Sequence, residues 1–103
     1  MRNSSKKIGN YAFANCRDIT ELNIPAVTAI GKYIFDWNVF NSKALTLTLG
    51  TNAPTIGWGS FNGVDGPFAI TVKVPAGNSG YNSSWISSLT DNRLGFTVNI
   101  VPQ

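Results

Sequence analysis

A spacing between apolar residues recurs three times along the chain and constrains its fold more than any other feature. Each copy begins with Ile-Gly and has a phenylalanine five residues after the isoleucine: Ile8 with Phe13, Ile30 with Phe35, and Ile56 with Phe61. A short apolar run follows each copy, and equivalent positions of the three runs (Leu22, Leu47 and Val72) are 25 residues apart. Self-similarity at such a period is typical of a solenoid, in which every copy forms one coil.

The three runs predict short parallel strands. Alternate side chains of a strand point to opposite faces, so one set of residues is expected to point inward: Leu22, Ile24, Leu47, Leu49, Val72 and Val74. One such strand cannot bury its apolar side alone. The copies are therefore expected to stack into a parallel sheet of about four strands over a continuous core.

The Ile-Gly segments are expected to form the return path of each coil. Their apolar residues close the core opposite the sheet, which makes core residues of Ile8, Phe13, Ile30, Phe35, Ile56 and Phe61. Gly9, Gly31 and Gly57 are expected to permit a tight backbone turn there.

The first copy is the most regular, and it resembles the unit of BspA-like leucine-rich repeat proteins. Residues 8–25 read IGNYAFANCRDITELNIP, against the family pattern I-G-x-x-A-F-x-x-C-x-x-L-x-x-L-x-I-P. Every fixed position is filled, with Ile19 in place of a leucine. The second copy departs through Ile34, Asn38 and an insertion around residues 37–42, and the third keeps only its anchor residues.

The resemblance implies a fold and a function. The expected fold is mainly β with minor α, a leucine-rich-repeat solenoid of about 2.5 to 3 units over residues 8–77. Proteins of this type are typically bacterial cell-surface or secreted proteins that bind host or bacterial proteins and lack enzymatic activity. The expected location is therefore extracellular or at the cell surface.

The two ends of the chain leave the repeat pattern. Residues 1–7 read as a polar leader or a cloning remnant. At the other end, residues 78–103 predict a capping unit, with a helix from about Gly80 to Leu89, a break at Asp91-Asn92 and a final strand over residues 97–101. Val98 and Ile100 would repeat the Val72 and Val74 pair at an offset of 26, which places this strand next in the sheet.

Composition argues against several kinds of function. The chain of 103 residues has no histidine, and its 8 Lys and Arg exceed its 5 Asp and Glu only because three of the basic residues lie in the first seven positions. We therefore expect no enzyme, no metal site, no cofactor and no nucleic-acid partner. No apolar run is long enough to insert in a membrane. The single cysteine, Cys16, is expected to be a small buried apolar residue.

The outward strand positions form the candidate partner-binding face, because the concave sheet of a solenoid is its usual contact surface. They fall into one row of Glu21, Thr46, Thr71 and Thr97 and a second row of Asn23, Thr48, Lys73 and Asn99. The plainer interpretation is that threonine and asparagine are simply tolerated on an exposed sheet.

An alternative site lies on the loop side of the coils. Trp37 and Trp58 occur in the two copies that depart most from the pattern, where exposed indole rings would stack on sugars. The alternative function is therefore a carbohydrate-binding accessory module. Such tryptophans also commonly fill the space that an insertion creates.

The first strand, over residues 19–24, is expected to be a bare sheet edge because no cap precedes it. Two explanations remain open: further repeats of a longer protein, or self-association through this N-terminal edge.

Overall fold

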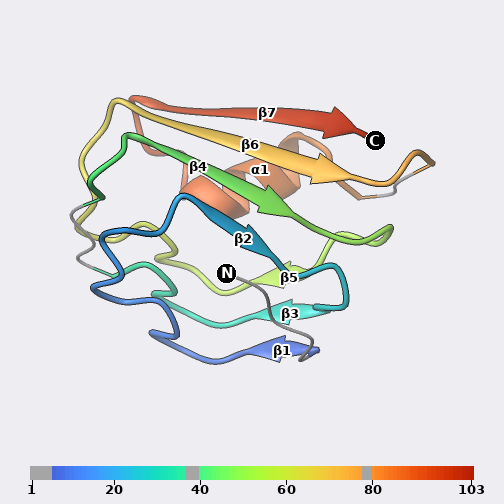
Figure 1. Ribbon diagram of the computed structural model, residues 1–103, viewed down its shortest axis with the longest axis horizontal. Coiled ribbons are helices and arrows are strands. Elements are labelled where there is room, and N and C mark those ends of the chain that lie inside the picture. Colours follow the sequence, from blue (N-terminus) through green and yellow to red (C-terminus); the bar gives the residue numbers. More distant parts are fainter. Residues whose placement is uncertain (1–5, 37–39, 78–79) are drawn as a thin grey trace.

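The computed structural model describes residues 6–36, 40–77 and 80–103, and shows two layers of short parallel strands with one helix (Figure 1). The elements in chain order are β1 (Lys7–Ile8), β2 (Glu21–Asn23), β3 (Ala29–Ile30), β4 (Ala44–Thr48), β5 (Thr55–Ile56), β6 (Phe68–Val74), α1 (Ser83–Thr90) and β7 (Phe96–Pro102). One layer is a four-stranded sheet in the order β2-β4-β6-β7, and the other is a three-stranded sheet in the order β1-β3-β5. The predicted solenoid, its parallel sheet and its C-terminal helix and strand are confirmed.

The three repeat strands pair in the predicted register. Leu22 lies opposite Leu47, and Leu47 lies opposite Val72, which is the 25-residue period of the sequence. The second layer is also in register, with Ile8 opposite Ile30 and Ile30 opposite Ile56. Its strands of two residues each were not predicted, because two residues are too few to show an alternating pattern.

The predicted register of the last strand was wrong by two residues. Ile100 lies opposite Val72, and Val98 lies opposite Ile70, so the offset between β6 and β7 is 28 and not 26. The aromatic rings at the strand starts account for this pairing: Phe68 lies opposite Phe96, and their ring centroids are 5.6 Å apart. A shift of two keeps every side chain on its predicted face.

The core fills the space between the two layers. The six residues predicted to point inward from the repeat strands are at most 2% exposed, and all of the predicted return-loop core residues except Ile56 are buried. Ile56 is partly buried and packs against the core. The return-loop phenylalanines form a stack, with centroid distances of 6.1 Å from Phe13 to Phe35 and 5.1 Å from Phe35 to Phe61.

The glycines of the Ile-Gly pairs have a different role from the predicted one. None of them has a positive φ, whereas Tyr11 (φ 59°), Asn15 (φ 60°) and Tyr33 (φ 55°) in the first two return loops do. A Cβ on Gly31 would lie 2.7 Å from the backbone of Gly9, and a Cβ on Gly57 would lie 2.7 Å from that of Gly31. The chain does turn directly after Gly9 and Gly31, but the turn does not use the special backbone freedom of glycine. Gly31 and Gly57 instead allow successive coils to approach closely.

The helix closes the C-terminal end of the second layer. It begins three residues after the predicted start, because the Asn82 side chain accepts a hydrogen bond from the Trp85 amide at 3.0 Å and caps it. In Figure 1, α1 continues the row of β1, β3 and β5. The Trp85 indole donates to the Pro54 carbonyl oxygen at 2.9 Å, and the Gly59 amide donates to the Asp91 carboxylate at 2.8 Å. Asp91 (φ 54°) and Asn92 (φ 56°) break the helix as predicted.

Candidate functional site

The outer face of the four-stranded sheet carries all eight residues predicted to bind a partner. The burial of strands β2, β4 and β6 alternates along the chain, so the polar residues point away from the core. Glu21, Lys73, Thr97 and Asn99 are exposed, and Asn23, Thr46, Thr48 and Thr71 are half-buried between their neighbours. The face itself is therefore present, while its role in binding stays a prediction.

The rows of this face differ from the predicted ones at β7. One row is Glu21, Thr46, Thr71 and Asn99, and the next is Asn23, Thr48, Lys73 and Val101. Thr97 belongs to a third row with Ala44 and Ala69. The two predicted β7 residues thus lie one row away from their expected neighbours, because of the register of that strand.

The third row forms a hollow in the outer face. Its volume is about 270 Å³, and its lining consists of Lys43, Pro67, Phe68, Ala69, Gly95 and Thr97. The hollow exists because the side chain of Ala69 is short and Gly95 has none, while buried Phe68 lies beneath. Gly66 and Gly95 also meet closely, since a Cβ on Gly66 would lie 3.1 Å from the Gly95 backbone.

Leu94 adds exposed apolar surface in the segment that leads into β7. It precedes Gly95 in the chain and is 95% exposed, the highest exposed fraction among the large hydrophobic residues that the structure describes. Lys43 is the one charged residue in the lining. The outer face is therefore uneven, with apolar surface and a positive charge gathered at the starts of β4, β6 and β7.

Sequence reasoning missed this hollow, although its signal was present. Ala44 and Ala69 are three residues before Leu47 and Val72, as the buried Ile19 is before Leu22. Because β4 and β6 include these alanines, strand alternation applies to them. An offset of three residues from the inward Leu47 or Val72 places both side chains on the outer face. Both are exposed.

A comparison with protein families decides the identity of the repeat. The family model described as BspA type leucine rich repeat region (6 copies) matches residues 1–89. The chain belongs to this family. Comparison with curated proteins and with solved structures gives no match.

Membership of the BspA-type family gives a coarse description of the molecule. Repeat proteins of this type are typically non-catalytic scaffolds that mediate protein–protein contacts, and the family is typical of bacterial surface proteins. Among the described residues, no helix is long and apolar enough to span a membrane. Within the same residues, no three His, Cys, Asp or Glu side chains form a group that could hold a metal ion.

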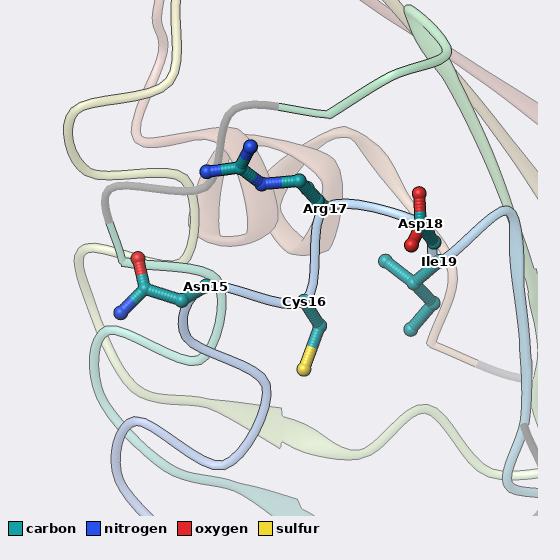
Figure 2. Close-up of a pocket in the computed structure, with 5 residues that line it drawn as sticks. All are labelled: Asn15, Cys16, Arg17, Asp18 and Ile19. Carbon is teal, nitrogen blue, oxygen red and sulfur yellow. The ribbon is translucent and has the colours of Figure 1, made fainter.

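The cysteine of the BspA-type unit lies at a second hollow, at the N-terminal end of the solenoid. This hollow has a volume of about 320 Å³ and is lined by residues 15–19 (Figure 2). The side chains of Cys16 and Arg17 point in opposite directions there. Cys16 is half-buried and packs against the core, so it is less covered than predicted. Apart from its shape, nothing among the described residues at this hollow indicates a ligand.

The loop side carries an exposed aromatic strip made of Tyr11, Tyr33 and Trp58. Tyr11 is 53% exposed and Trp58 is 58% exposed. The rings of Tyr11 and Tyr33 stack at 5.3 Å and 12°, and Trp58 meets Tyr33 edge-on at 4.8 Å. Trp37, the other predicted ligand-binding residue, lies outside the described residues. The two tyrosines were missed, although both occupy the fourth position of the Ile-Gly segments.

Ring packing within the strip limits what it can bind. Tyr33 contacts a ring on either side, stacked with Tyr11 and at 66° to Trp58, and the Lys32 ammonium lies 6.0 Å from the centroid of the Trp58 ring. Loss of solvent around Tyr33 raises its pKa, and neighbouring Tyr11 and nearby carboxylates add to that rise. The rings of the strip are tilted against one another, so the strip offers the exposed parts of Tyr11 and Trp58 and not a continuous flat platform.

Proposed function

We propose that the chain is a non-catalytic protein-interaction module, and that its partner binds the outer face of the four-stranded sheet at the hollow between Lys43 and Thr97. The hollow is the single observation that carries this proposal. Apolar surface is concave there, so an apolar side chain of a partner would be partly covered.

The composition of the hollow suits a protein partner. Energetically dominant contacts of an interface are apolar anchors in desolvated pockets, surrounded by a polar rim. Buried Phe68 and exposed Ala69 and Pro67 supply the apolar lining, and Thr97 and Lys43 supply polar groups around it. A partner segment with an apolar side chain beside a carboxylate would match both features.

The location that goes with this function is the bacterial cell surface or the extracellular space, where such a module would serve in adhesion. Family membership supports this part of the proposal, since BspA-type repeats are typical of surface proteins. The small number of ionisable groups on the outer face is also consistent with contacts made by shape and hydrogen bonding.

The test is a binding screen of the purified protein against an array of host extracellular proteins and bacterial surface proteins. Ala69→Arg fills the hollow, and Ala76→Arg places the same side chain on an exposed turn after β6 as a matched control. We expect a protein partner whose affinity falls at least about tenfold with Ala69→Arg and not with Ala76→Arg. Equal binding by both variants would contradict the hollow as the site.

Two further substitutions separate the hollow from the rest of the face. Thr48→Arg and Lys73→Glu alter the row of Asn23, which lies two rows from the hollow on the same side of the sheet. A partner that covers the whole face would be weakened by all of these changes. A partner confined to the hollow would respond to Ala69→Arg alone.

The exposed indole of Trp58 favours carbohydrate binding as a second candidate function. An open tryptophan face stacks on sugar rings, and Trp37 was predicted to contribute with it. We place carbohydrate binding second because the neighbouring rings of the strip pack against one another. Glycan-array binding that is lost with Trp58→Ala and Trp37→Ala, and kept with Leu94→Ala, would favour the carbohydrate function over the protein partner.

A further inference from the structure

The outer edge of β7 is the longest unpaired strand edge that the structure describes. β7 has seven residues, pairs with β6 on one side and ends the sheet on the other. The opposite end of the sheet is β2, which has three residues, begins with the charged Glu21 and is followed by Pro25 after two residues. Short length, charge and proline are the features that protect sheet edges from pairing.

The backbone groups of β7 show which residues face the open edge. The Phe68 amide donates to the Gly95 carbonyl oxygen, and the Gln103 amide donates to the Val74 carbonyl oxygen. Successive residues of a strand direct their backbone groups to opposite sides, so the odd-numbered residues of β7 face β6. The amides and carbonyls of Phe96, Val98 and Ile100 therefore face outward.

The side chains of the same three residues are incompletely covered. Phe96, Val98 and Ile100 point toward the core but remain half-buried, as expected for the last strand of a layer. β7 contains no charged residue, and its one proline, Pro102, is its last residue. None of the usual protections against pairing is present over residues 96–101.

We propose that a second copy of this chain pairs with the open edge of β7, in an antiparallel arrangement with a twofold axis at Val98. In this register Val98 lies opposite Val98 of the other copy, and Phe96 lies opposite Ile100. All three residues with outward backbone groups then form hydrogen-bonded pairs. The twofold axis makes the contact self-complementary and closed.

The pairing has two structural consequences. It joins two four-stranded sheets into one of eight strands and brings the half-buried Phe96, Val98 and Ile100 next to their counterparts. On the outer face, Thr97 of each copy comes opposite Asn99 of the other, because the sum of paired residue numbers is constant in an antiparallel pair. The inference moves self-association from the N-terminal edge of the sheet to its C-terminal edge, and it does not depend on the proposed binding function.

The Thr97–Asn99 pair allows a matched test by charge. The variant T97K/N99K places like charges opposite each other twice in the dimer, and T97E/N99K places opposite charges there twice. Both variants alter the same exposed residues, so their effects on the isolated chain are comparable. Sedimentation equilibrium and light scattering measure association, and circular dichroism confirms that each variant is folded.

We expect the unaltered chain to dimerise in a concentration-dependent manner between about 10 µM and 1 mM. The T97K/N99K variant is expected to weaken the dimer at least about tenfold, and high salt should restore part of the loss. The T97E/N99K variant should dimerise at least as well as the unaltered chain. Val98→Pro, which removes an outward amide at an edge position, should give a folded monomer.

Three results would overturn the proposal. The first is an unaltered chain that stays monomeric throughout the concentration range. The second is a dimer that both charge variants affect equally, which would exclude the antiparallel register. The third is a dimer that persists in T97K/N99K and in Val98→Pro, which would place the interface elsewhere, including the edge of β2.

Discussion

Single residues in this molecule are constrained mainly by the coil that lies next to them. Gly31 has the backbone of Gly9 and Asn10 within 2.7 Å of the place where a Cβ would be, whereas the same position of Gly9 meets no heavy atom within 4 Å. Inward residues such as Leu22 and Leu47 could be predicted from the sequence, because strand periodicity alone determines their side. The roles of the glycines and of left-handed Tyr11 depend on distances between coils, which no local pattern reports.

The two glycines give a residue-scale prediction with a built-in control. Gly31→Ala should reduce the free energy of unfolding by about 1–3 kcal/mol, because the backbone of the neighbouring coil would have to move. Gly9→Ala should change it by less than about 0.5 kcal/mol, since the site is open and its φ is not positive. Urea unfolding followed by circular dichroism measures both. Similar losses in the two variants would contradict the stacking role.

Tyr81 gives a pH-dependent prediction. Its hydroxyl donates to the Gly50 carbonyl oxygen at 2.7 Å, and burial raises its pKa from 10.0 to about 12. Because the folded chain holds this proton more tightly than the unfolded chain, the contribution to stability is fully present below the unfolded pKa and is lost as pH rises through the folded value. Unfolding free energies measured in urea should fall between about pH 10 and pH 12, and Tyr81→Phe should reduce that fall. Identical pH profiles for the two proteins would exclude Tyr81 as the cause.

At the scale of elements, the strands that belong to a repeat unit were predictable in register and the last strand was not. β2, β4 and β6 have equivalent residues 25 positions apart, and their register followed from the sequence. β7 has no repeat unit of its own, so its register depends on the contact of Phe96 with Phe68. The outer face was predicted for the same reason as the core, while the hollow at Ala69 was missed because it depends on where β4 and β6 begin.

Leu47 tests the register of the central strand β4. Its side chain is 2% exposed and lies between Leu22 and Val72. Leu47→Ala should cost on the order of 2–5 kcal/mol of unfolding free energy, because it leaves a cavity in the middle of the core. Thr48→Ala, on the outer side of the same strand, should cost less than about 1 kcal/mol. A loss below about 0.5 kcal/mol for Leu47→Ala would show that the residue does not point inward.

The whole molecule behaves as a stack of coils in which each coil contacts only its neighbours. In such an arrangement stability is approximately a sum of coil and interface terms, and end coils open more readily than central ones. β4 and β6 each have a paired strand on both sides, whereas β2 and β7 have one. The solenoid form was predictable from the repeat, but the relative exposure of its two ends was not, since it depends on the lengths of β2 and β7.

Hydrogen exchange would measure this gradient along the stack. Amides of β4 and β6 should exchange most slowly, and those of β2 should exchange much faster because its outer side is unpaired in the described structure. At low protein concentration β7 should resemble β2. At high concentration the amides of Phe96, Val98 and Ile100 should become slower if the second copy covers them. Uniform protection across the four strands would contradict the stack.

The number of residues between equivalent strand positions differs between the two layers. Strand residues Leu22, Leu47 and Val72 are spaced by 25 and 25 positions, whereas Ile8, Ile30 and Ile56 of the other layer are spaced by 22 and then 26 positions. The differences in coil length are therefore accommodated at the corners between the layers, and the strands of both sheets stay in register. Such corners tolerate insertions and deletions over evolution, and they are the natural places to graft new loops onto this scaffold without redesigning its core.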